Sequence, residues 1–162
     1  MPMPAHMTMT GNQQGDIAGS CEMKGREGTV IVYGEEHVIE IPRDTHSGLP
    51  TGKRIHHPLT VTKEFDKASP MLYQALCSGE QLNPVTLKYY RIDPQGAEQH
   101  YFTVELQNAI IVSMEPYFPL TFADESKPFK HMEKLSLTYE KIIWTFEDGG
   151  ISAEDAWTAP RE

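Results

Sequence analysis

The chain has 162 residues and a formal net charge of −9, and 39% of its residues are hydrophobic while 23% are charged. This length suits one domain with one buried core, which we expect to span residues 1–162, and the composition is that of a globular protein. The acidic balance argues against nucleic-acid binding, and no apolar run reaches the ~18 residues that a membrane span requires.

Two further features of the composition concern export and redox chemistry. The N-terminal run MPMPAHMTMTGNQQG has neither a basic stretch nor a continuous apolar stretch, so it does not predict a Sec signal peptide. Cys21 and Cys77 lie far apart without C-x-x-C spacing, which favours free thiols over a disulfide framework or a zinc site. We expect Cys77 to be buried because it lies in a predicted helix.

The first third of the chain shows the alternation that is typical of β-strands. Residues 5–10 predict a first strand, followed by a loop at 11–15, and residues 17–23 are candidates to pair next. The β-branched segment 29–42 predicts either one bent strand or two, ended by Pro42, which cannot donate to a ladder.

Residues 43–58, RDTHSGLPTGKRIHHP, predict a long loop, because they contain two glycines and two prolines but few large apolar groups. Long ordered loops tend to be functional. The end of this loop is basic in an otherwise acidic chain, through Lys53, Arg54, His56 and His57. Two interpretations stay open: the loop meets an acidic face of another copy, or it is a solvated loop with a local positive patch.

One helix has clear start and stop signals. Ser69 suits the N-cap, Pro70 suits the first helical position, and Gly79 suits the residue after the helix. Its apolar residues form one stripe, which indicates a helix packed against a sheet; they are Leu72, Ala75 and Leu76.

A hairpin follows the helix. Residues 85–92 predict one strand, the turn Asp93-Pro94-Gln95-Gly96 reverses the chain, and residues 98–113 predict the returning strand. Its apolar residues share one parity, which predicts one buried and one exposed face; they are Phe102, Val104, Leu106, Ile110, Val112 and Met114. Residues 115–132 combine three prolines with charges and predict a loop.

The C-terminal run has two alternating halves. The apolar positions between residues 133 and 146 change phase across Glu140-Lys141, which predicts one long strand, bulged there, that serves two sheets or closes a barrel. The cluster Glu147-Asp148-Gly149-Gly150 predicts a tight reversal, and Trp157 is expected to dock on the protein. The predicted fold class is mainly β: an antiparallel β-barrel, or two packed sheets, with one flanking α-helix.

No pattern in the sequence predicts a catalytic, metal or cofactor site. His56 and His57 are neighbours, so they point in opposite directions on an extended segment and do not form a chelating pair. Cys77 has no adjacent base, and a Gly-x-Ser-x-Gly nucleophile motif and a phosphate-binding glycine loop are both absent from the sequence. We therefore expect a protein without enzymatic activity.

Three long segments, in order, resemble the haemolysin-coregulated protein (Hcp) family of bacterial type VI secretion systems. They are KRIHHPLTVTKEFDKASPMLYQALCSGE at 53–80, VTLKYYRIDPQGAEQHYFTVELQNAIIVS at 85–113, and YEKIIWTFEDGGISAEDAW at 139–157. The C-terminal signature residues are Glu140, Lys141, Trp144, Glu147, Asp148, Gly149, Gly150 and Trp157.

The resemblance implies a β-barrel with a helix at its side, acting as the structural tube subunit. It implies hexameric rings that stack into a tube, with a spike protein, a contractile sheath, a baseplate and secreted effectors as partners. It also implies passage from the cytoplasm to the exterior without a cleaved signal peptide, and neither nucleic-acid binding nor membrane insertion.

The resemblance also suggests where subunits meet. The polar faces of the strands at 85–92, 98–113 and 133–146 are candidates for the channel wall. The loop residues expected to contact other subunits are Arg43, Asp44, His46, Lys53, Arg54, His56 and His57. The alternatives are a secreted β-barrel that binds a ligand or a host surface, a small hydrolase with an unrecognised site, and another phage-tail-like tube or spike-base component.

Overall fold

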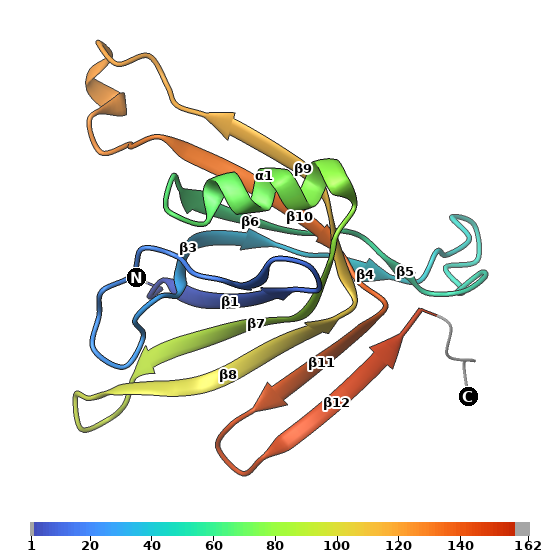
Figure 1. Ribbon diagram of the computed structural model, residues 1–162. Helices are drawn as coiled ribbons and strands as arrows, with labels where there is room; N and C mark the ends of the chain where they lie inside the picture. Colours follow the sequence, from blue (N-terminus) through green and yellow to red (C-terminus); the bar gives the residue numbers. More distant parts are fainter. Residues whose placement is uncertain (1, 158–162) are drawn as a thin grey trace.

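The computed structural model describes residues 2–157, so Met1 and residues 158–162 of the expected domain lie outside it. Figure 1 shows a mainly β structure with the helix α1 (Ser69–Ser78) at its side and a single 3₁₀ turn, η1 (Asp124–Ser126), among the described residues. The strands are β1 (Ala5–Gly11), β2 (Gly15–Ile17), β3 (Val30–Glu36), β4 (Ile39–Glu40), β5 (Ile55–His56), β6 (Leu59–Glu64), β7 (Gln81–Ile92), β8 (Glu98–Gln107), β9 (Ala109–Tyr117), β10 (Met132–Thr138), β11 (Lys141–Phe146) and β12 (Ile151–Ala156).

Six strands close a barrel in the order β7, β9, β10, β6, β3 and β1, because β1 also pairs with β7. The pairings are antiparallel. Outside the barrel, β8 pairs with β7, β11 with β8, and β12 with β11, and we call these three outer strands the wing. The predicted fold class, an antiparallel barrel with one flanking helix, is confirmed.

The barrel interior is filled by alternating side chains from its strands. Leu59 and Val61 of β6 and Leu135 and Leu137 of β10 are fully buried or nearly so, as period-two alternation requires. Helix α1 adds Leu72, whose side chain has no exposed surface, to the same core. Each such side chain contributes about 1.5–3 kcal/mol when it leaves water.

Two corners carry the chain from the barrel into the wing. The first lies at Asn108, whose φ of 52° separates β8 from β9. The second lies at residues 139–140, between β10 and β11. The corners are joined, because the Asn108 side-chain amide donates to the Glu140 carboxylate at 2.8 Å and the Glu140 amide donates to the Gln107 carbonyl at 3.1 Å.

These corners explain two differences from the predicted strands. The predicted returning strand at 98–113 is two strands, so parity reverses after Leu106: Ile111 is buried, whereas Val112 is 47% exposed. The predicted long C-terminal strand is likewise two strands rather than one bulged strand, although the break falls where the phase changes. The predicted loop at 115–132 is shorter, because β9 continues to Tyr117.

The strand predictions for the first third of the chain differ from the structure only in detail. Within the candidate segment 17–23, Ile17 pairs with β1, while residues 18–23 lie outside the strands. The segment 29–42 forms two strands, β3 and β4. Of the two alternatives for that segment, the second is confirmed.

Helix α1 begins differently from the prediction. Ala68 is the N-cap, Ser69 is the first helical residue, and the Ser69 hydroxyl donates to Glu133 on β10 at 2.6 Å instead of capping the helix. Gly79 ends the helix with a φ of 69°, as predicted. Cys77 is exposed, not buried, because the helix turns Leu72 and Ala75 toward the barrel; Cys21 is the buried free thiol.

Candidate assembly surfaces

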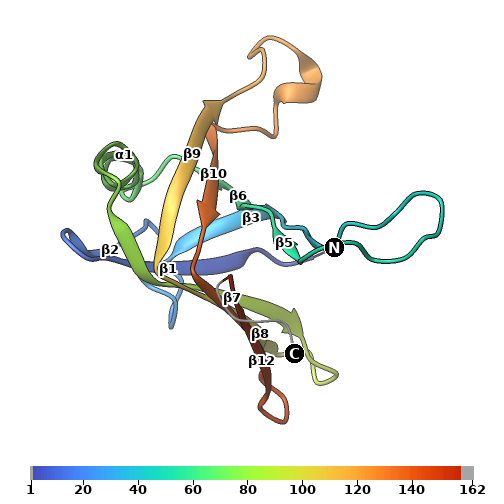
Figure 2. The same cartoon turned by 90° about the vertical axis from the view of Figure 1, so that its right-hand side faces the viewer.

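Three parts of the molecule project from the barrel. Figure 2 shows the loop between β4 and β5, the loop between β9 and β10, and the hairpin of β11 and β12 extending in different directions. We call residues 41–54 the basic loop and residues 118–131 the arm. Surfaces that stand away from the core are available for contact with other molecules.

The wing presents a polar face. The strand register places Thr86, Glu105, Ile143 and Glu154 in one row across β7, β8, β11 and β12. The next row is Lys88, Thr103, Thr145 and Ser152. The opposite face carries Leu87, Val104 and Trp144 in register, of which Leu87 is fully buried. The wing therefore has one face toward the core and one polar face.

Strand β12 is one end of the sheet. Within the described residues it pairs with β11 on one side, and Ile151 at its start is 68% exposed. The turn before it uses Gly149 and Gly150, with φ angles of 90° and 64°, which confirms the predicted tight reversal. An unpaired strand edge presents N–H and C=O groups that can extend a sheet into another chain.

The basic loop is folded on itself. Arg43 forms an isolated bridge with Pro50, and the Asp44 amide donates to the Leu49 carbonyl at 2.9 Å. Hydrogen bonds from Ser47, and then from the His46 amide, lower the pKa of the Asp44 carboxyl. Four of the predicted contact residues lie in the projecting part of this loop: Arg43, Asp44, His46 and Lys53.

The other three predicted contact residues lie at the base of the loop. Arg54 donates to the Asp155 carboxylate at 2.5 Å and to the Ala156 carbonyl at 2.6 Å. His56 is buried and His57 exposed, so the two rings point in opposite directions, as predicted. Arg54 and His56 hold the loop to the rest of this chain.

His56 is the centre of a polar cluster at that base. Its Nδ1 lies 2.6 Å from the Tyr139 hydroxyl, and its Nε2 lies 2.7 Å from Asp155. His37 reaches the same Tyr139 hydroxyl at 3.0 Å, and the Trp157 ring centroid lies 5.2 Å from that of His56. The expectation that Trp157 docks on the protein is therefore confirmed, although 45% of this residue stays exposed.

The pKa values in this cluster are shifted by burial and by charge. Burial raises the pKa of the Tyr139 hydroxyl well above its usual range, and the Asp155 charge adds to this shift. The hydrogen bond from Arg54 lowers the pKa of Asp155. Burial is also the main cause that lowers the pKa of His37 from its ordinary value of 6.5. Tyr139 therefore stays protonated and Asp155 stays ionised at neutral pH.

Three members of this cluster were not predicted from the sequence: His37, Tyr139 and Asp155. Tyr139 lies at the phase change between the two alternating runs, which is the signal that marks a corner. His37 and Asp155 gave no such signal, because they come from segments 118 residues apart in sequence that only the folded chain brings together.

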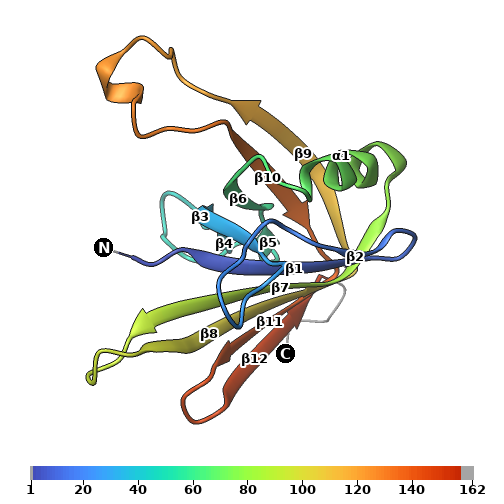
Figure 3. The ribbon, with the colours of Figure 1, turned by 60° about the vertical axis from the view of Figure 1, so that its left-hand side comes forward.

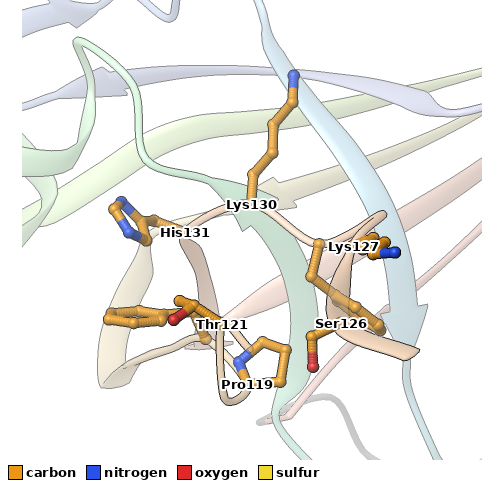
Figure 4. Close-up of a pocket in the computed structure, with 8 residues that line it drawn as sticks. Pro119, Thr121, Ser126, Lys127, Lys130 and His131 are labelled. Carbon is orange, nitrogen blue, oxygen red and sulfur yellow. The ribbon is translucent and has the colours of Figure 1, made fainter. Parts of the chain in front are cut away.

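The arm combines exposed apolar groups with lysines. Phe118, Leu120, Phe122 and Phe129 are between 54% and 84% exposed. A cavity of about 390 Å³ lies within the arm, and Figure 4 shows Pro119, Thr121, Ser126, Lys127, Lys130 and His131 around it. Lys127 pairs with Asp124 at 2.9 Å, and Lys130 lies 3.5 Å from Glu64 of β6.

Among residues 2–157, no group of three or more His, Cys, Asp or Glu side chains is arranged to hold a metal ion. No helix in this part of the chain is long and apolar enough to cross a membrane.

Comparison with known proteins identifies the family. The sequence profile of the family described as "Type VI secretion system effector, Hcp" matches residues 6–146. This chain belongs to the Hcp family. It is 42% identical to the "Major exported protein" of Pseudomonas aeruginosa over 99% of this chain and 98% of that protein. The resemblance inferred from the three sequence segments is confirmed.

Solved Hcp structures have the same fold. A variant of Hcp1 from the Escherichia coli EAEC 042 pathovar is 38% identical, with a TM-score of 0.84 over 96% of this chain and 99% of that one. The secreted protein Hcp3 from Pseudomonas aeruginosa is 37% identical, with a TM-score of 0.79 over 95% of this chain and 99% of that one. The chain is thus a type VI secretion protein of a family of structural, secreted tube proteins.

Proposed function

We propose that this Hcp protein forms hexameric rings that stack into a secreted tube and carry effectors in the channel. The observation that supports this most is the identity of 42% with an exported relative over almost the whole of both chains. The proposed partners are other copies of the chain, a spike protein, a contractile sheath, a baseplate and effectors. The proposed route leads from the cytoplasm to the exterior without a cleaved signal peptide.

In the proposed ring, the wing builds the channel wall. Its polar face suits a water-filled channel, because polar side chains such as Thr103, Glu105 and Glu154 outnumber the apolar Ile143 in its rows. The open edge of β12 suits pairing with the neighbouring subunit. Such a contact joins two different surfaces, so it closes into a ring when the rotation between subunits allows closure.

In the proposed stack, the basic loop contacts the next copy. Arg43 and Lys53 lie in its projecting part within a chain of net charge −9, so an acidic face of another copy is a complementary partner. Arg54 and His56 act indirectly in this account, since they fix the base of the loop.

The proposed role requires no chemistry from the protein, and we propose that it is not an enzyme. The barrel interior holds a core of packed side chains such as Met7, Leu87 and Leu106. A filled interior favours the tube subunit over the alternative of a barrel that encloses a small ligand.

Export tests this proposal in cells. A tagged copy should appear in the culture medium of cells with a complete type VI system and remain inside cells that lack the contractile sheath. A cytoplasmic enzyme measured in the same medium controls for lysis. Equal amounts outside both strains would contradict export through the proposed tube.

A further inference from the structure

One hydroxyl group joins two histidines at the base of the basic loop. His37 follows β3 and His56 ends β5, and both direct a ring nitrogen to the Tyr139 oxygen, at 3.0 and 2.6 Å. The other nitrogen of His56 lies 2.7 Å from the Asp155 carboxylate on β12. These three hydrogen bonds link the ribbon of β4 and β5 to the barrel corner and to the wing.

The donors and acceptors in this chain of groups limit how many protons it can hold. When both histidines are neutral, His37 donates from Nε2 to the Tyr139 oxygen, the hydroxyl donates to Nδ1 of His56, and Nε2 of His56 donates to Asp155. Each of these three contacts then has one hydrogen.

One additional proton also fits. A charged His56 donates from Nδ1 to the Tyr139 oxygen and from Nε2 to Asp155, and the hydroxyl turns to donate to Nε2 of His37. The added positive charge lies beside the Asp155 carboxylate. All three contacts again have one hydrogen.

A second added proton does not fit. With both rings charged, His37 and His56 both donate to one Tyr139 oxygen, and the hydroxyl hydrogen has no acceptor among these groups. Two positive rings then also face each other across one atom. This repulsion agrees with the pKa of His37, which is lowered first by burial and next by the charge of His56.

The charges around the cluster do not remove this conflict. Asp155 faces His56 and is shared with Arg54, whose charge opposes that of a protonated histidine. On the His37 side, Glu36, Glu40 and His57 line the same surface pocket. Glu40 pairs with His57 at 2.9 Å, and the charge of His57 also lowers the pKa of His37, whereas a backbone hydrogen bond with His57 raises it.

We propose that His37, Tyr139 and His56 form a latch that holds the β4–β5 ribbon on the barrel while at most one ring is charged and releases it when both are. Since the ribbon leads into the basic loop, the latch sets the position of that loop. If the loop contacts other copies, which rests on the proposed function, acid weakens those contacts.

The sign and size of the pH effect follow from linkage. The closed state disfavours the second proton, so the open state binds more protons below the ordinary histidine value of 6.5. If the open state binds one extra proton, the equilibrium constant for opening rises about tenfold for each pH unit below that value. Strands of two residues do not stay paired alone in water, so release exposes the ribbon amides.

Hydrogen exchange measured by NMR on the full chain tests the latch. The reporter is the His57 amide, which donates to the Val38 carbonyl at 3.0 Å. After correction for the intrinsic pH dependence of exchange, we expect its opening constant to rise at least about tenfold between about pH 7 and about pH 5. Amides of β10 in the core should stay protected and show that the whole protein has not unfolded.

Three variants separate the latch from a general loosening of the protein in acid. His37→Gln keeps a donor for the Tyr139 oxygen but cannot gain a charge, so its ribbon should stay protected at the lower pH. His57→Gln, at the exposed neighbouring ring, is the matched control and should keep the acid response. Tyr139→Phe removes the shared oxygen, so fast ribbon exchange at both pH values is expected.

An unchanged acid response in His37→Gln, or no response in the wild type, would overturn the latch. Native mass measured on the same samples keeps the two proposals apart. Intact rings without a pH response in the ribbon reject the latch, whereas a pH response without rings at any pH rejects the proposed assembly.

Discussion

A buried ion pair gives the sharpest prediction about stability. Lys63 and Glu133 face each other across β6 and β10, and neither side chain has exposed surface. The Lys63 amine also lies 3.0 Å from Asp66 and 3.1 Å from the Ser69 hydroxyl of helix α1. Tyr73 of the same helix donates to Glu133 at 3.3 Å. The pair thus ties the helix to two barrel strands, and Figure 3 shows α1 beside them.

Lys63→Met removes the positive charge and keeps most of the volume. The Glu133 carboxylate would then stay buried without its ionic partner, which costs about 3–5 kcal/mol of the free energy of unfolding. For a chain of this size, such a loss lowers the melting temperature by about 6–20 °C. Urea titration and thermal unfolding, followed by circular dichroism, measure both quantities.

Two further variants show whether the unpaired charge causes the loss. Lys63→Met combined with Glu133→Leu removes both charges and should recover most of the stability. Thr60→Val changes a neutral pair on the same two strands, where Thr60 lies 2.9 Å from Ser136, and should cost less than about 1.5 kcal/mol. A loss below about 1 kcal/mol in Lys63→Met would refute the reasoning.

Three other predictions concern a carboxylate, a glycine and the basic loop. The pKa of Glu80 is lowered, first by the hydrogen bond from the Gln14 side chain, so the ionised carboxylate stabilises the fold above the ordinary glutamate pKa and this stabilisation is lost as the pH falls. In urea titrations, the difference in free energy of unfolding between the wild type and Glu80→Gln should therefore become smaller in acid. Gly19→Ala would place a Cβ 2.4 Å from the Thr29 carbonyl oxygen and should cost about 1–3 kcal/mol, whereas Gly34→Ala, with its nearest contact at 3.6 Å, should unfold like the wild type. The double variant Arg43→Glu, Lys53→Glu should have a lower oligomer mass than the wild type and the same melting temperature. The control is Lys24→Glu with Lys67→Glu, which reverses two charges elsewhere on the surface and should keep the oligomer mass. If both double variants keep the wild-type mass, the loop has no part in assembly.

Local patterns predicted most of the elements but not their partners. Alternation located the strands, and Gly79 and the Gly149-Gly150 pair marked a helix end and a reversal, because positive φ favours glycine. The corner at Asn108 was missed, since a single asparagine with positive φ gives a weak signal, and the parity of the following strand was therefore assigned to the wrong face.

The candidate surfaces were predicted only in part for a similar reason. The basic loop is visible as a local charge pattern, whereas Asp155 reaches His56 across 99 residues through strand pairing. Lys63 alternates in step with Leu59 and Val61, so it lies on the same face of β6 as these two apolar residues. A charged residue on the apolar face of a strand is the signal that could have revealed the buried pair.

The native mass of the purified protein tests the central claim most directly. Mass spectrometry or light scattering over about a tenfold range of concentration should reveal a species of six chains of 18.3 kDa, or about 110 kDa. The ring account predicts that this species persists or grows into larger multiples as concentration rises. A monomer of 18.3 kDa at every concentration would contradict assembly of this chain into rings on its own.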